Sequence, residues 1–245
     1  MDRSDLVHLR ESGYIRYHQR NLTAIMDVGE IGPKHIPAHA HADTLSYELS
    51  LGGKRIVVDS GTSCYAMNHD RMYQRSTAAH NTVEMDGSDS SEVWGVFRVA
   101  RRARPKGLEI SEDSGSLTVR CAHDGYKRLH GRPEHLREFN LTDRSITLTD
   151  FIEGKGRHVA KGFLHFHPCV HLRSNTDDPL SFDLSMNGQL FGIVHVEMWD
   201  RVELEPSTYS PEFGIRQPNQ KLVCLWAGVV PFQGKIKIEF GASPS

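Results

Sequence analysis

This sequence contains few cysteines, and it has neither long apolar runs nor a surplus of basic residues. The four cysteines (Cys64, Cys121, Cys169 and Cys224) form no CxxC pair, which argues against a cysteine-ligated zinc site. We expect mostly buried free thiols, with disulfides left open. No apolar segment is long enough to span a bilayer. The net charge of −2, from 29 basic and 31 acidic residues, lacks the uniform basic field of a nucleic-acid-binding protein.

The first residues also lack a targeting feature. The segment MDRSDLVHLRESG is charged and has no apolar centre, so we expect no secretory signal in this chain. We expect residues 1–12 to be a linker or tail. No repeat or firm domain boundary follows, and 245 residues fit one large β domain, so we assign residues 1–245 to a single domain.

Long stretches with a helical period are missing too. Residues 70–81 are the best candidate for a short helix. Two-residue alternation dominates instead, with breaks rich in Gly, Pro, Asn and Asp, and this predicts an antiparallel β-sandwich or barrel. In KIKIEF, for example, Ile236 and Ile238 face one way and Lys237 the other. The predicted strands are residues 14–18, 21–28, 55–59, 116–121, 145–152, 160–167, 190–199, 221–230 and 235–240.

Histidine, by contrast, is abundant, with 15 residues, and one segment concentrates it. In PAHAHAD, His39, His41 and Asp43 alternate with alanines. On an extended strand these three side chains would project from one face. They then form a metal site, an acid/base site or an unusual piece of surface. A bend in the strand would instead send them to separate targets.

Two further polar clusters indicate a metal site only in combination with this one. Alone, Asp59 in VVDSGT is a turn-starter, and His80 in STAAHNTV is a hydrogen-bonded core histidine. Two histidines and an aspartate from separate segments would, however, suit a zinc ion with an open fourth position. An HxH pair by itself is a weak signal, because cupins and histidine-rich surfaces also contain it.

The order of these motifs resembles the heparinase II/III-like family of polysaccharide lyases. The resemblance is carried by HAHADTLSYELSLGGKRIVVDSGTSCY and RMYQRSTAAHNTVEMDGSDSSE, which together span about residues 36–92. The strand series after them fits less sharply. Such lyases consist of an N-terminal α/α toroid followed by a β-sandwich, with the catalytic cleft between them. This chain resembles the sandwich part alone (a super-sandwich), so its independent activity as an enzyme stays uncertain.

The resemblance also implies roles for individual residues. His41, Asp59 and His80 match the metal ligands, usually of one zinc ion, with a structural role favoured; another divalent metal would also suit them. His39 matches a catalytic histidine that faces the cleft. Tyr65 falls near the tyrosine that some relatives place at the cleft, and Tyr73 competes with it. Asp43, Arg75 and Asn81 are supporting or substrate-side positions, and Asp43 would fix the tautomer of a ligating imidazole.

The implied reaction is β-elimination on a uronate-containing acidic polysaccharide. Neutralising the uronate carboxylate would stabilise the charge that develops when a base removes the C5 proton. Heparan-like, alginate-like and bacterial exopolysaccharide glycans all contain such units. The resemblance further implies a toroid domain as a partner in cis or in trans, and a periplasmic or secreted location.

Two other interpretations stay open. A cupin-type metalloenzyme would need a glutamate four or five residues after the HxH pair, but Glu48 lies seven residues after His41. A glycan-binding or accessory module with a structural zinc would need no toroid. The basic run VFRVARRARPK is more typical of a solvated face than of a glycan-binding rim.

Overall fold

The chain is described by a computed structural model over residues 5–33, 35, 38–113 and 115–241. This part contains nineteen β-strands, one α-helix and two 3-10 helices. Neighbouring strands of the three larger sheets pair antiparallel. The expected all-β class with little helix is therefore confirmed. Within these residues, no helix is both long and apolar enough to cross a membrane.

Five N-terminal strands form one sheet in chain order. Burial alternates along β2 and β3, because every second side chain of a strand faces the core. Residues 5–9, within the segment expected to be a linker or tail, form strand β1 and pair with β2. The five strands are β1 (Asp5–Leu9), β2 (Tyr14–Gln19), β3 (Leu22–Asp27), β4 (Tyr47–Leu51) and β5 (Lys54–Val57).

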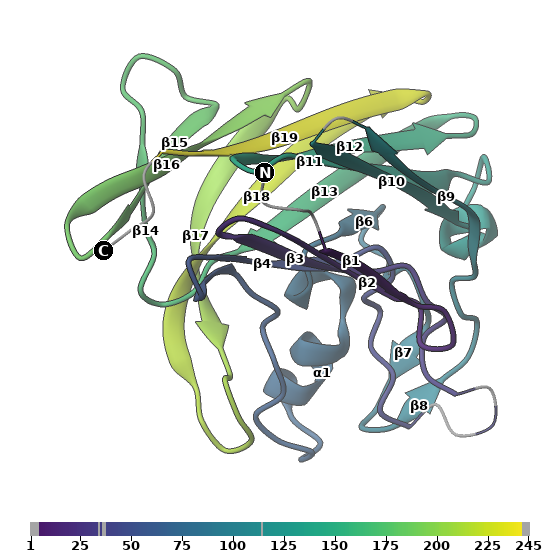
Figure 1. The fold of residues 1–245 in the computed structure, drawn as a ribbon. Coiled ribbons are helices and arrows are strands. Elements are labelled where there is room, and N and C mark those ends of the chain that lie inside the picture. Colours follow the sequence, from purple (N-terminus) through teal and green to yellow (C-terminus); the bar gives the residue numbers. More distant parts are fainter. Residues whose placement is uncertain (1–4, 34, 36–37, 114, 242–245) are drawn as a thin grey trace.

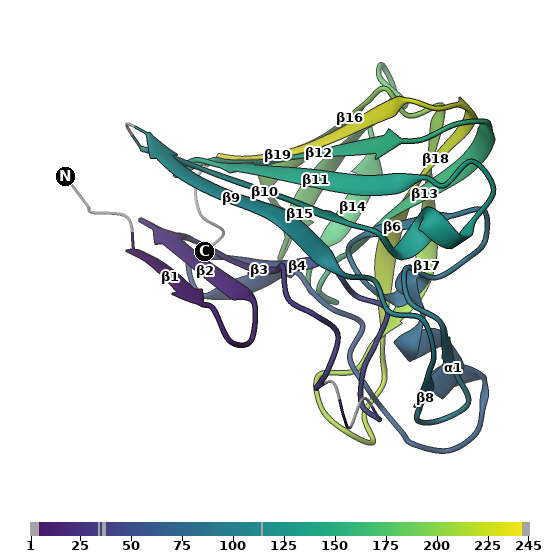
Figure 2. The same cartoon turned by 90° about the vertical axis from the view of Figure 1, so that its right-hand side faces the viewer.

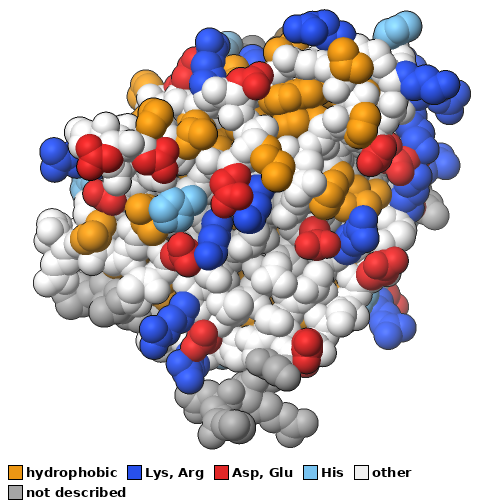
Figure 3. Space-filling model, turned by 90° about the horizontal axis from the view of Figure 1, so that it is seen from above, with side chains coloured by type: hydrophobic (Ala, Val, Ile, Leu, Met, Phe, Trp, Pro, Cys, Tyr) orange, Lys and Arg blue, Asp and Glu red, His pale blue; other side chains and the backbone are white. Residues whose placement is uncertain are grey.

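The largest sheet has eight strands in the order β14-β15-β16-β19-β12-β11-β10-β9. In β19, Ile236, Ile238 and Phe240 are buried, as the alternation of KIKIEF predicts. Figure 3, seen from above, shows charged and apolar side chains interspersed on the outer surface. The strands are β9 (Pro105–Asp113), β10 (Ser116–His123), β11 (Glu134–Leu141), β12 (Ser145–Glu153), β14 (His171–Ser174), β15 (Ser181–Met186), β16 (Gln189–Glu197) and β19 (Phe232–Phe240).

A four-stranded sheet and a short hairpin complete the strands. The sheet order is β17-β18-β13-β6, and β7 pairs with β8. One hydrophobic cluster joins the three larger sheets, with Ile15, Phe139 and Leu222 each 0% exposed. These strands are β6 (Val83–Met85), β7 (Val93–Trp94), β8 (Arg98–Val99), β13 (Arg157–His165), β17 (Arg201–Tyr209) and β18 (Gln217–Val229).

The helices lie at the edge of the sandwich. Figures 1 and 2 show the five-stranded sheet below the eight-stranded sheet, with α1 and the β7–β8 hairpin lower still. The helix predicted over residues 70–81 is shorter than expected: α1 (His69–Arg75) ends where Ser76 is extended, and η1 (Thr77–Ala79) follows as a 3-10 turn. A second 3-10 turn is η2 (Gly125–Arg128). All four cysteines are free, and Cys121 and Cys224 are buried.

Candidate functional site

Residues 38–46 form an irregular segment between β3 and β4, so the extended strand considered for PAHAHAD is wrong. The alternation of exposure nevertheless survives, because Ala40 and Ala42 are 7% and 0% exposed while His39 is exposed. The segment leaves the sheet because its polar groups bond elsewhere: the backbone N–H of Ala42 donates to the carbonyl of Arg75 at 2.9 Å. The small alanines therefore face inward, whereas His39 is exposed and His41 and Asp43 are only partly buried.

Arg75 fixes the shape of this segment. It is 1% exposed. Its Nε and Nη2 donate to the carbonyl of Ala40 at 3.1 and 3.0 Å. Further bonds reach the carbonyls of Trp94, Gly95 and Arg98. The guanidinium is thus enclosed by backbone carbonyls, and it joins the histidine segment to the β7–β8 hairpin.

Four titratable side chains converge behind this segment. One potential ligand atom from each of His41, Asp43 and His80 lies within 4.8 Å of the other two. The rings of His41 and His80 have centroids 5.3 Å apart. Asp59, two residues after β5, accepts a hydrogen bond from Nδ1 of His80 through its Oδ2. The other ring nitrogen of His80, Nε2, is buried and has no hydrogen-bond partner among the described residues.

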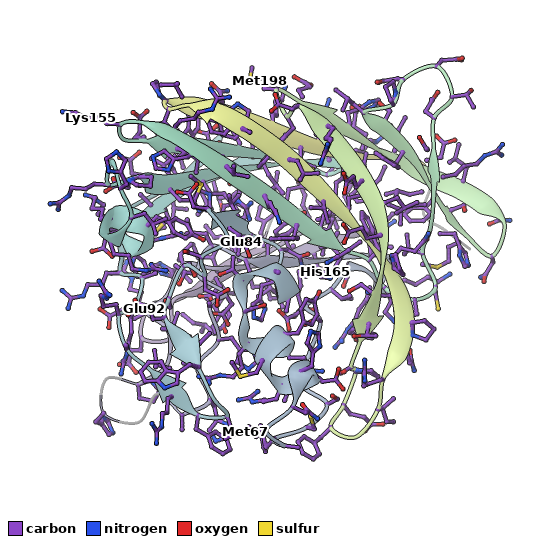
Figure 4. The ribbon with its side chains drawn as sticks, turned by 180° about the vertical axis from the view of Figure 1, so that it is seen from behind. Met67, Glu84, Glu92, Lys155, His165 and Met198 are labelled. Atoms are coloured by element: carbon purple, nitrogen blue, oxygen red, sulfur yellow. The ribbon has the colours of Figure 1, made fainter. Side chains whose placement is uncertain are left out.

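Asn81 holds the backbone around this cluster. Its side-chain amide donates to the carbonyls of Tyr47 at 2.8 Å and Val58 at 2.9 Å. Its Oδ1 accepts from the backbone N–H of His165 on β13 at 2.7 Å, and His165 is labelled in Figure 4. The residue next to His80 is thereby tied to the segment that ends at Asp59.

A buried ion pair supports the same cluster from β11. Arg137 donates to both carboxylate oxygens of Asp150, at 2.7 and 2.9 Å. Its Nη1 also donates to the carbonyls of Leu45 at 2.9 Å and Asn81 at 2.6 Å. Arg137 and Asp150 are each 1% exposed. One guanidinium therefore holds the backbone at two places. These are Asn81, next to His80, and Leu45, two residues after Asp43.

Asp59 and His80 form a charged pair. Burial raises the pKa of Asp59, but the charge of His80 and its hydrogen bond outweigh burial and hold that pKa at about 2. Burial lowers the pKa of His80, but the Asp59 carboxylate outweighs this effect and raises it to about 9. Without a metal, the pair is thus an imidazolium–carboxylate ion pair at neutral pH.

The other two members of the cluster are shifted mainly by burial. Burial, followed by the charge of His80, lowers the pKa of His41 to about 3. Burial raises the pKa of Asp43 to about 6, although the charge of His80 opposes this shift. His41 is therefore a neutral imidazole at physiological pH, which is the form that binds metal ions.

The residues present fit a divalent metal. A neutral imidazole, a second imidazole with a buried unpartnered nitrogen, and two carboxylates are the nitrogen and oxygen donors that zinc takes. A histidine ligand commonly donates its other N–H to a carboxylate, and the bond from His80 to Asp59 has this form. His41, His80 and a carboxylate of Asp43 or Asp59 could thus hold one ion.

His39 lies apart from this cluster, among aromatic rings. Its ring centroid is 5.3 Å from that of Tyr65 and 5.7 Å from that of Phe97. The ring of Phe213 contacts Tyr65 at 5.0 Å. Tyr65, Phe97 and Phe213 are 43%, 43% and 60% exposed, so this aromatic patch is open at the surface. An exposed imidazole and an exposed phenol are therefore adjacent.

The competing tyrosine lies elsewhere. The hydroxyl of Tyr73 donates to the carbonyl of Ala78 at 3.2 Å. The Nζ of Lys221 is 5.6 Å from the centroid of its ring. Of the two candidate tyrosines, Tyr65 is therefore the one beside His39.

Arg71 is a site residue that sequence reasoning missed. Its Nη1 donates to Nε2 of His41 at 3.2 Å, and its guanidinium carbon lies 5.0 Å from the centroid of the Tyr65 ring. Its position four residues before Arg75 on α1 could have revealed it, because that spacing places both on one helix face, and both are buried. Arg71 links the buried cluster to the aromatic patch.

Two cavities meet at the cluster. A groove of about 1190 Å³ is lined by His39, His41 and Asp43 and by the β1–β2 turn. A smaller pocket of about 220 Å³ is lined by Asp43, Asp59 and His80. Asp43 lines both cavities. Tyr14 and Asp27 also line both, so the cluster lies where the two cavities adjoin, and His39 lines the larger one.

The fold and site together define an antiparallel β-sandwich that carries a histidine–carboxylate cluster beside a groove. The chain belongs to the family described as Heparinase II/III-like, C-terminal, which matches residues 1–238.

Solved structures resemble the fold at low sequence identity. Heparan sulfate lyase HepC from Pedobacter heparinus is 12% identical, with a TM-score of 0.77 over 98% of this chain and 37% of that chain. The Heparinase III-BT4657 gene product is 16% identical, with a TM-score of 0.74 over 99% and 36%. At such identities the likeness concerns the fold alone. This chain spans little more than a third of the length of these structures, and a comparison with curated proteins finds no match.

Proposed function

We propose that this chain is the β-sandwich part of a polysaccharide lyase that cleaves uronate-containing acidic glycans by β-elimination. The observation that carries the proposal is the pairing of His39 with Tyr65, 5.3 Å apart between ring centroids, beside a buried histidine–carboxylate cluster. Membership of the family and the likeness to a heparan sulfate lyase agree with it. The glycan would lie in the groove that His39 lines.

In this proposal His39 and Tyr65 have different catalytic roles. An N–H of His39 would donate to the uronate carboxylate, which lowers the cost of the negative charge that develops at C5. Tyr65 would exchange protons with the sugar, either as a phenolate that takes the C5 proton or as a phenol that gives its proton to the leaving oxygen. Arg71 would keep positive charge near the phenol, since its guanidinium carbon is 5.0 Å from that ring centroid.

A divalent ion, with zinc as the first choice, is part of the proposal. His41 and His80 would supply nitrogen ligands, and Asp59 or Asp43 a carboxylate. The sequence motifs favour Asp59 as the ligand, whereas the grouping of ligand atoms favours Asp43. A bound ion would brace the segments that carry His39 and Asp59 and add positive charge beside the groove.

A helical toroid, in cis or in trans, is the proposed partner. The chain covers 37% of the length of the heparan sulfate lyase it resembles. The exposed aromatic patch of Tyr65, Phe97 and Phe213 is the surface expected to face such a partner. The isolated chain should then be weakly soluble or self-associating, and its activity should depend on the toroid. A periplasmic or secreted location stays a prediction of the resemblance.

The test is a cleavage assay on heparan-like, alginate-like and bacterial uronate polymers, with and without a toroid partner. Lyase action yields an unsaturated uronate, which is detected by its ultraviolet absorbance. The expected result is product with at least one polymer and its loss in His39→Ala. Binding of a glycan without any unsaturated product, even with the toroid present, would favour a glycan-binding accessory module instead.

A further inference from the structure

A second groove, of about 770 Å³, lies outside the histidine site and is rich in arginine. Its lining includes Arg101, Arg102 and Arg104, from the segment between β8 and β9, and Arg128 from η2. Two carboxylates, Glu30 and Asp124, also line it. Glu92 adds a third carboxylate beside this lining, because it pairs with Arg101 at 2.9 Å and with Arg128 at 3.8 Å. Four guanidinium groups against three carboxylates still leave the groove cationic, although the whole protein carries a net charge of −2.

The arginines are presented by the local backbone. Ala103 is 1% exposed, and its N–H donates to Oγ of Ser91 at 2.8 Å. Because Ala103 faces inward, Arg102 and Arg104 on either side of it face the groove. The basic run VFRVARRARPK, expected to be a plain solvated face, therefore lines a concave surface.

Three of the four guanidinium groups are held in place by the protein. Arg128 donates to the carbonyl of Ser90 at 3.2 Å. Arg101 donates through Nε to the carboxylate of Glu92, labelled in Figure 4, at 2.9 Å. Arg102 donates to the carbonyl of Pro33 at 3.2 Å. These bonds reduce the ordering cost of binding an anion at this groove.

Arg104 differs from these three. Its backbone N–H donates to Oδ1 of Asp124 at 2.9 Å, which fixes the position of the chain. Within the part of the chain that the structure describes, its side chain makes no hydrogen bond or ion pair. Arg104 therefore offers an uncompensated fork of N–H donors, whose planar geometry matches a carboxylate or a similar oxyanion.

The arginine groove adjoins the histidine groove. Glu30 lines both cavities. Arg102, which lines the arginine groove, is bonded to Pro33, which lines the histidine groove. A polymer lying past His39 could therefore continue into the arginine groove.

We propose that the arginine groove is a subsite for the carboxylate or sulfate groups of an acidic glycan, away from the position of cleavage. This inference rests on the proposed function for the nature of its ligand. Arg104 is the principal contact, and Arg101, Arg102 and Arg128 supply the surrounding charge. A glycan long enough to reach both grooves then binds more tightly than a short one.

The experiment measures binding of size-defined oligosaccharides to this whole chain by fluorescence anisotropy, without following cleavage. Heparan sulfate and its unsulfated uronate backbone are used in parallel, and the series that responds identifies sulfate or carboxylate as the recognised group. The matched control is Arg173→Gln, because Arg173 is an exposed arginine on β14 that lines none of the cavities described above.

For Arg104→Gln we expect about tenfold weaker binding of the longer oligosaccharides, the size typical of a lost charge-assisted hydrogen bond. Binding of the shortest ones and the effect of Arg173→Gln should change less than about twofold. Equal losses in both variants, or no loss in either, would overturn the subsite. Equally tight, Arg104-dependent binding of single-stranded DNA would also overturn it.

The experiments distinguish failure of the subsite from failure of the proposed lyase function. Arg104-dependent binding of long glycans without any cleavage would retain the subsite and reject the lyase. Cleavage accompanied by unchanged affinity in Arg104→Gln at every length would retain the lyase and reject the subsite.

Discussion

Asp59 and His80 are joined through Nδ1 of the imidazole, which leaves Nε2 of His80 buried without a partner among the described residues. The bond fixes the orientation of the ring in the same way that a carboxylate orients a metal-ligating histidine. One potential ligand atom of His80 also lies within 4.8 Å of ligand atoms of His41 and Asp43. Asp59 therefore accepts a hydrogen bond from His80, whereas Asp43 belongs with His80 to the group of possible metal ligands.

The first prediction separates the roles of these carboxylates. Replacing a carboxylate that orients a ligand typically weakens metal affinity by about 10–100-fold, whereas replacing a ligand should weaken it more. If the observed geometry persists when metal is bound, Asp43→Asn costs more affinity than Asp59→Asn. If Asp59 is the ligand, as the motifs imply, the order is reversed. Competition titration of zinc against a chromophoric chelator measures both variants.

Equal affinity in both variants and the wild type would contradict a role for either carboxylate. Both substitutions keep the side-chain volume, so lost packing does not confuse the comparison.

The second prediction concerns the tyrosine of the groove. Tyr65→Phe removes the hydroxyl beside His39 and should lower the rate of glycan cleavage by about 10²-fold or more, as expected for a lost proton-transfer group. Tyr73→Phe is the matched control, because the Tyr73 hydroxyl bonds to the carbonyl of Ala78. Rates are compared in the presence of the toroid partner. A larger loss in Tyr73→Phe would refute the assignment.

The third prediction tests the ion pair beneath the site. Arg137→Met leaves the Asp150 carboxylate buried with a hydrogen bond from His135 but without its guanidinium. This should cost about 3 kcal/mol of unfolding free energy, the lower end of the range for a broken buried pair. The double variant Arg137→Met/Asp150→Leu should lose less, because no charge is left unpaired. Urea unfolding of the metal-free chain gives both values. A loss below about 1 kcal/mol in the single variant would show that the pair is dispensable.

The fourth prediction is a pH dependence of stability. Burial, reinforced by the charge of Lys221, lowers the pKa of His165 to about 3, and burial lowers the pKa values of His123 and His135 as well. In the unfolded chain a histidine titrates near about 6.5. Between these values the unfolded chain binds protons that the folded chain does not, so stability falls as the pH drops from 7 to 5.

The slope for each such histidine approaches about 1.4 kcal/mol per pH unit below its unfolded pKa. His165→Gln, which keeps a donor for the carbonyl of Ala78, should make the dependence shallower. Leu222→Ala is the control, because its cavity should lower stability equally at both pH values. Urea unfolding in the presence of a chelator measures the slopes, and an unchanged slope in His165→Gln would refute the account.

Local periodicity was enough to predict much of the sandwich. The alternation in KIKIEF and the other predicted segments corresponds to real strands, because burial on one face imposes a two-residue period. The same reasoning failed for PAHAHAD: its alternation of exposure is real, but Arg75 and its neighbours, rather than an adjacent strand, bond its backbone. Periodicity reports which side chains face inward, not which groups satisfy the backbone.

The functional site could be predicted from the sequence less completely than the fold. Motif order singles out His39, His41, Asp59 and His80. The structure groups His41, Asp59 and His80 with Asp43 and places His39 beside Tyr65. Arg137 and the arginine groove could not be foreseen, because they depend on contacts between segments far apart in the chain. Membership of the heparinase II/III-like family sets aside the cupin interpretation.

The most direct test of the central claim is the metal content of the purified chain by elemental analysis, after zinc supplementation and removal of loosely bound ions. Because the chain has 15 histidines, His171→Ala on β14 is the control for adventitious binding. We predict about one zinc per chain in the wild type and in His171→Ala, and its loss in both His41→Ala and His80→Ala. A metal-free wild type, or variants at His41 and His80 that keep their zinc, would contradict the account.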